Sequence, residues 1–132
     1  MARLNAGACI FAALAVLLPA ERTAAAQSAA DEELFRKNCQ TCHSLADDGV
    51  QRAGPTLQHL FGRKAGSVAG FAYSQALKDA EFAWTAEALD AWLTLPQSYL
   101  PGTYMMYRQA DPEIRAAIIR YLQAVAGHTQ AQ

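Results

Sequence analysis

The sequence lacks the charge imbalance that would point to a nucleic-acid partner. Its 132 residues carry 11 basic and 12 acidic side chains, a net charge of −1, and only three residues are lysine. Binding to a phosphate backbone needs clustered Lys and Arg, so the composition excludes nucleic acid. No alternating run is long enough to predict a strand. A chain of this length has room for one domain.

A long hydrophobic run is also missing. The longest apolar stretch covers residues 6–18, follows Arg3 and is too short to cross a bilayer. A positive start, a short apolar stretch and small residues at 24–26 are typical of a secretory signal peptide. We expect residues 1–26 to be that signal and residues 27–132 to be an exported domain without a membrane span. An uncleaved anchor is the alternative, but charged residues follow the apolar stretch directly.

Cysteine is scarce, and the predicted cleavage leaves two of the three, Cys39 and Cys42. The mature part would hold nine basic and eleven acidic residues, a net charge of −2. An exported chain meets an oxidising compartment, so these two thiols should be bonded to each other or to another group.

Helical patterns dominate the mature part and predict an all-α domain. Asp111 and Pro112 provide a cap and a first helical residue, and Gly127 should end that helix. The predicted helices cover residues 31–41, with Asp31 or Ser28 as the cap, 73–80, 85–95, with Thr85 as the cap, and 112–127. About half of the mature part is therefore loop, and a domain this small usually needs an additional stabilising link, which a large apolar ring bonded to the chain would supply.

The chemistry is carried by the run from Cys39 through Cys42 to His43, which matches the C-x-x-C-H pattern of c-type haem attachment. Cysteines three residues apart lie on one face of a helix, so both sulfurs can reach one edge of a porphyrin. The next residue, His43, can then bind the iron through a neutral imidazole nitrogen.

Two other interpretations of the cysteine pair remain open at this point. A thioredoxin-like redox pair also uses C-x-x-C, but that fold needs a βαβ pattern that the sequence does not show. A zinc site would need further ligands. Only His59 and His128 are left to provide them.

A second axial ligand could come from Met105 or Met106, since thioether sulfur suits haem iron. A methionine is more often core filling than a ligand. The turn formed by Pro101 and Gly102 favours a ligand role, because it can fix a loop across the second haem face.

Taken together, the sequence resembles class I cytochrome c, the soluble mitochondrial and bacterial type, from about Asp31 to Ala126. Besides C-x-x-C-H, the matching motifs are Gly54-Pro55-x-Leu57, Phe61-Gly62-Arg63-Lys64-Ala65-Gly66, Gly70-Phe71-x-Tyr73-Ser74, Trp84, Pro101-Gly102-Thr103-Tyr104-Met105 and Tyr121-Leu122.

The resemblance implies a role for each matching residue. His43 is the proximal iron ligand, Met105 is the distal ligand, and Pro55 accepts a hydrogen bond from the imidazole. The groups that pair with the haem propionates are implied to be Arg63, Tyr73 and Trp84. The first and last helices are implied to cross, with Phe35, Tyr121 and Leu122 at the crossing.

The implied fold is a small cytochrome c fold, with three to five helices and long loops around one covalently bound haem c. The implied function is single-electron transfer in the periplasm by a monomer, between membrane or periplasmic respiratory oxidoreductases, and not enzyme catalysis. The alternative is a haem peroxidase or gas-binding protein with an open distal site.

The sequence departs from the family pattern near the haem. Gln97, Ser98 and Tyr104 stand where many relatives carry lysines, so docking should depend less on long-range attraction. Trp92 replaces a tyrosine beside the ligand sulfur, and Leu77 replaces an asparagine. We expect both changes to remove polar groups from the haem surroundings.

Overall fold

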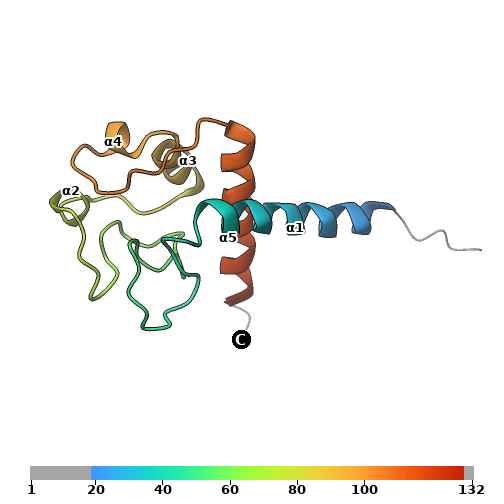
Figure 1. Cartoon of the computed structure of the whole chain (residues 1–132), viewed down its shortest axis with the longest axis horizontal. Helices are drawn as coiled ribbons and strands as arrows, with labels where there is room; N and C mark the ends of the chain where they lie inside the picture. Colours follow the sequence, from blue (N-terminus) through green and yellow to red (C-terminus); the bar gives the residue numbers. More distant parts are fainter. Residues whose placement is uncertain (1–18, 130–132) are drawn as a thin grey trace, which may run out of the picture.

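The computed structural model describes residues 19–129, with side chains from 23 to 126, and it contains five helices joined by long loops (Figure 1). The helices are α1 (Pro19–Asn38), α2 (Gln75–Lys78), α3 (Ala86–Thr94), α4 (Pro96–Tyr99) and α5 (Pro112–Thr129). Within this range the backbone has no named strand, only an isolated bridge between Lys64 and Ala83. The predicted all-α class is confirmed. The apolar stretch 6–18 lies outside the described residues.

Helix α1 differs from the prediction at both ends. It begins by Pro19 and ends at Asn38, whereas we expected residues 31–41. The stretch 23–30 is exposed but rich in alanine, the best helix former, and it contains no breaker. The helix therefore runs through the predicted cleavage position, which itself stays a prediction. Asp31 lies inside the helix and is not its cap.

Helices α1 and α5 cross at the centre of the molecule (Figure 1). The rings of Phe35 and Tyr121 meet there, with centroids 5.1 Å apart, and Leu122 is buried beside them. Beside this contact, the Arg120 guanidinium donates two hydrogen bonds of 2.9 Å to the Asp31 carboxylate. The crossing implied by the resemblance is confirmed, and the ion pair adds to it.

The caps of α3 and α5 are as predicted. The Thr85 hydroxyl accepts a hydrogen bond from the amide of Ala88, and the Asp111 carboxylate accepts one from the amide of Glu113. One short helix was not predicted, and one end point is wrong. Pro96 ends α3 but also starts α4, since proline suits the first turn of a helix. Helix α5 passes Gly127 and continues to Thr129, because one glycine only weakens a helix.

The site is enclosed between this helical frame and the loops. Helix α3 packs against α5 and α4, and the loop that follows Cys42 covers the opposite side. Trp84 and Trp92 meet edge to face, with centroids 5.3 Å apart, and belong to the main buried cluster. None of the described helices is long and apolar enough to cross a membrane.

Candidate haem site

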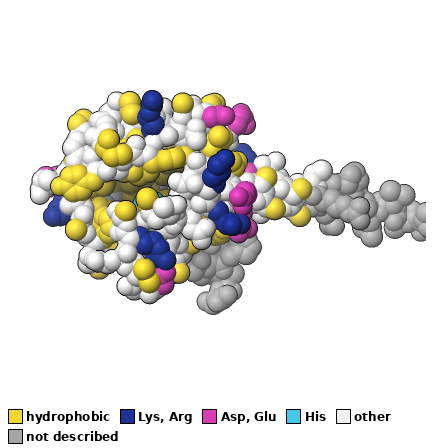
Figure 2. All heavy atoms as spheres, in the orientation of Figure 1, with side chains coloured by type: hydrophobic (Ala, Val, Ile, Leu, Met, Phe, Trp, Pro, Cys, Tyr) yellow, Lys and Arg dark blue, Asp and Glu magenta, His cyan; other side chains and the backbone are white. Residues whose placement is uncertain are grey.

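A cavity of about 340 Å³ opens on the face shown in Figure 2, where hydrophobic side chains border a hollow. Its volume falls in the range of about 300–1,000 Å³ that is usual for ligand and cofactor pockets. Mostly apolar residues line it, from the loop after α1, from α3, from the segment after α4 and from α5. All four residues predicted to bind the cofactor, Cys39, Cys42, His43 and Met105, line this cavity.

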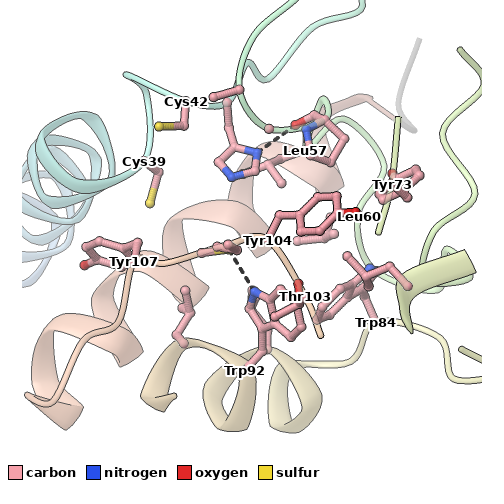
Figure 3. A pocket seen from close by; sticks show the side chains of 18 of the residues that line it. Cys39, Cys42, Leu57, Leu60, Tyr73, Trp84, Trp92, Thr103, Tyr104 and Tyr107 are labelled. Atoms are coloured by element: carbon pink, nitrogen blue, oxygen red, sulfur yellow. Dashed lines mark hydrogen bonds between the residues drawn. The ribbon is translucent and has the colours of Figure 1, made fainter. Parts of the chain in front are cut away.

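The two cysteines lie on a turn that directly follows α1. The amide of Cys42 donates to the carbonyl of Cys39 over 3.1 Å, and the amide of His43 donates to the same carbonyl over 2.9 Å. Both thiols are free and lie on one side of the cavity (Figure 3). Burial raises the pKa of Cys39 to about 12, and the neighbouring Cys42 adds to this effect. The Cys39 thiol is therefore protonated, while Cys42 is exposed.

A hydrogen bond to the backbone fixes the orientation of the His43 imidazole. Its Nδ1 lies 2.7 Å from the carbonyl oxygen of Pro55, as the resemblance implied. Because a carbonyl only accepts hydrogen bonds, Nδ1 carries the proton and Nε2 is left with a lone pair. Burial lowers the pKa of His43, although the Pro55 contact opposes this. The neutral form that can bind a metal is therefore favoured.

Gly54 provides the space that the imidazole occupies. A Cβ atom at this position would overlap the His43 ring, while the amide of Gly54 donates to the carbonyl of Cys42 over 2.8 Å. The glycine is thus required for close approach of the loop to the ring, not for an unusual backbone angle.

On the other side, Met105 is half-buried and its sulfur accepts a hydrogen bond. The indole Nε1 of Trp92 lies 3.0 Å from Met105 Sδ, drawn as a dashed line in Figure 3. The expectation that Trp92 removes a polar group near the sulfur is wrong, because an indole N–H is a donor. Met106 is 78% exposed. The geometry therefore distinguishes the two methionines, which residue type alone could not.

Three further residues from the resemblance also line the cavity. The Arg63 guanidinium donates to the backbone carbonyls of Gln58, over 2.6 Å, and Thr56, over 2.9 Å. The Tyr73 hydroxyl accepts a bond of 3.4 Å from the amide of Val68. Burial lowers the pKa of Arg63 and raises that of Tyr73. Trp84 is buried at the cavity wall. Their pairing with propionates stays a prediction.

One polar residue of the cavity, Thr103, could not be assigned a role from the sequence. Thr103 is 4% exposed, and its hydroxyl has no hydrogen-bond partner among the described residues. A buried hydroxyl without a partner is costly, so Thr103 has the capacity to bind a polar group of a cavity ligand. Its position after the Pro101–Gly102 turn is visible in the sequence, but no sequence pattern predicts that its side chain is buried.

These residues fit a c-type haem. The cavity is apolar, one side carries two thiols, an imidazole nitrogen and a thioether sulfur are available, and a buried hydroxyl lacks a partner. For the zinc alternative, no three side chains of His, Cys, Asp or Glu form a metal-binding group in the described part of the chain. His59 is exposed and does not line the cavity.

Comparison with known proteins agrees with this fit. The family model for cytochrome c matches residues 28–126. Cytochrome c2 of Blastochloris viridis is 37% identical over 83% of this chain and 87% of its own. Cytochrome c of Guizotia abyssinica is 38% identical over 76% of this chain and 91% of its own. The solved structure of cytochrome cH from Methylobacterium extorquens, 36% identical, matches with a TM-score of 0.66 and covers 74% of this chain and 97% of its own.

The cofactor is accordingly haem c with its iron, and the activity is electron transfer, not enzyme catalysis. This chain belongs to the cytochrome c family.

Proposed function

We propose that this protein carries single electrons on a low-spin haem that is attached through Cys39 and Cys42, with His43 and Met105 as axial ligands. The observation that carries the proposal is that one cavity collects both thiols, the imidazole and the only half-buried methionine of the 105–106 pair. Each thiol would add across a vinyl group, its sulfur bonding one carbon and its proton passing to the other. The attachment therefore consumes no oxidant or reductant.

The haem supplies the one-electron change, and the chain sets the conditions for it. Pro55 holds the proton on Nδ1 of His43, so the ring keeps one orientation. Trp92 holds the sulfur of Met105 from the other side. The apolar walls exclude water, and two strong ligands leave no open position where a substrate could bind. This arrangement favours electron transfer over bond-making chemistry.

Replacement of each methionine tests this ligand set against an open haem site. We expect the purified protein to show a low-spin spectrum, a pyridine haemochrome typical of two thioethers and no binding of carbon monoxide when reduced. Met105→Ala should become high-spin and bind carbon monoxide. Met106→Ala is the matched control, because this neighbouring side chain is exposed, and it should behave as the wild type. Carbon monoxide binding by the wild type would instead support the peroxidase or gas-binding alternative.

We propose that the carrier works as a monomer in the periplasm, between membrane or periplasmic oxidoreductases. The signal-like pattern of residues 1–26 supports export. Tyr104 and Met106, which carry no charge, are 74% and 78% exposed at the border of the cavity. Docking at this border should therefore depend only weakly on salt. N-terminal sequencing of the periplasmic protein tests the export, and electron-transfer rates against ionic strength test the docking.

A further inference from the structure

We propose that Gln97 is a positioning residue, whose side-chain amide holds the segment 103–106 against the cavity and thereby keeps Met105 in place. The proposal rests on the proposed ligation by Met105. It assigns a role to a residue that lies outside the cavity lining and that the sequence alone distinguishes only by its departure from the family pattern.

The segment that carries Met105 has little backbone support of its own. At its start the amide of Thr103 donates to the carbonyl of Leu100 over 3.3 Å, and beyond its end the amide of Gln109 donates to Leu93 over 2.7 Å. Between them, none of the amides of residues 104–108 donates to a backbone carbonyl within the described chain. Side-chain contacts must therefore hold this stretch.

Gln97 provides the shortest of these contacts. Its Nε2 donates to the carbonyl of Thr103 over 2.6 Å. The same nitrogen lies 3.5 Å from the carbonyl of Met105 and 3.6 Å from Met106 Sδ. The first distance is that of a strong hydrogen bond, and the other two are weak. One side-chain amide thus contacts three residues of the segment, Thr103, Met105 and Met106, and its main bond is the one to Thr103.

Helix α4, which carries Gln97, is well anchored in the core. Gln97 follows Pro96, which is among the most buried side chains of the protein, and α4 is closed by a bond of 2.9 Å from the amide of Leu100 to the carbonyl of Pro96. The ring of Tyr99, also on α4, packs against Phe82 and Trp92. A hydrogen bond from Gln97 can therefore restrain the segment that carries Met105, because the backbone of α4 is already ordered and loses little further freedom.

Trp92 and Gln97 therefore restrain Met105 in different ways. Trp92 contacts the sulfur from α3, whereas Gln97 contacts the backbone carbonyls of Thr103 and Met105 from α4. Without Gln97 the Met105 sulfur keeps its own partner, so the resting spectrum should not change. The segment should open more often, and an external ligand should then reach the iron faster.

The test measures the rate at which imidazole binds to the ferric holoprotein, at imidazole concentrations where departure of Met105 limits the rate. Gln97→Ala and Gln97→Glu should bind imidazole about five- to tenfold faster, as expected for one lost hydrogen bond. Gln97→Glu keeps the size of the side chain but loses the N–H donor. Gln75→Ala is the matched control, because Gln75 donates to Asp79 and not to this segment. Rates equal to those of the wild type in both Gln97 variants would overturn the proposal.

A second measurement separates this inference from the proposed function. Amide hydrogen exchange of Thr103 and Gln109, which bound the segment and donate to the carbonyls of Leu100 and Leu93, should be faster in the Gln97→Ala holoprotein than in Gln75→Ala, whichever ligand the iron has. If Met105→Ala binds imidazole no faster than the wild type, Met105 ligation fails, and exchange alone then decides whether Gln97 holds the segment. Unchanged exchange would refute the role of Gln97 and leave the ligation intact.

Discussion

The indole nitrogen of Trp92 donates a hydrogen bond to the sulfur of Met105 over 3.0 Å, and so connects the middle of α3 to a segment 13 residues further along the chain. A donor on this sulfur withdraws electron density that would otherwise stabilise the oxidised iron. The contact should therefore raise the reduction potential, as second-sphere hydrogen bonds do in other metal sites.

Trp92→Phe should lower the reduction potential. The replacement removes the N–H donor but keeps an aromatic ring in the core. One hydrogen bond of about 0.5–1.5 kcal/mol corresponds to a decrease of up to about 60 mV for one electron. A redox titration measures it, and Tyr99→Phe is the control, because Tyr99 packs against Trp92 without contacting the sulfur. A potential equal to that of the wild type would show that the contact does not act on the iron.

Asp31→Asn should destabilise the protein, and the loss should depend on pH. Asp31 is buried, and mainly its hydrogen bonds with Arg120 lower its pKa below the ordinary 3.8. A lowered pKa stabilises the fold above the unfolded value and loses this effect as the pH falls through the folded value. We expect a loss of about 1–2 kcal/mol at pH 7, since Arg120 is about half exposed.

Denaturant unfolding at several pH values measures this difference, which should shrink below about pH 4. Glu33→Gln removes an exposed pair with Arg36 and is the control, with little effect expected. A difference that stays constant down to pH 2 would argue against a role for the Asp31 charge.

His59→Gly should stabilise the protein by about 0.5–1 kcal/mol. His59 has a φ of 51°, the only positive φ of a non-glycine residue in the described chain. Glycine adopts this conformation without strain, which outweighs its greater freedom in the unfolded state. Thermal unfolding provides the measurement. Ala69→Gly, at an exposed position with ordinary φ, should instead lower the melting temperature.

Gly54→Ala should destabilise the holoprotein by about 1–3 kcal/mol and reduce the yield of attached haem, because the methyl group would overlap His43. Gly49→Ala is the control. Gly49 has a φ of 69° but nothing within 4 Å of an added Cβ. Alanine at this position therefore strains the backbone without contacting the site. Haem content per protein and chemical unfolding distinguish the two effects.

Local chemistry explains which parts of the fold could be predicted from the sequence. Thr85 and Asp111 cap their helices because a short polar side chain before the first turn can accept a hydrogen bond from an otherwise unpaired amide. The start of α1 could not be predicted in the same way. Alanine suits both a cleavage region and a helix, so residues 24–30 permit either.

Within the site, Cys39, Cys42 and His43 could be singled out because the C-x-x-C-H spacing is typical of haem attachment, whereas only the family resemblance favoured Met105 over Met106. The contacts of Trp92, Thr103 and Gln97 could not be predicted, since each joins positions that only the folded loop brings together. Residue type was even misleading for Trp92, whose replacement of a tyrosine looked like the loss of a donor.

The pairing of Asp31 with Arg120 joins positions 89 residues apart, close to the two ends of the described chain. During synthesis both thiols and His43 emerge early, while the wall contributed by Ile118 and Leu122 is made last. A nascent chain that lacks α5 thus presents its attachment cysteines beside an incomplete wall. The wall of the cavity is complete only when α5 has packed against α1.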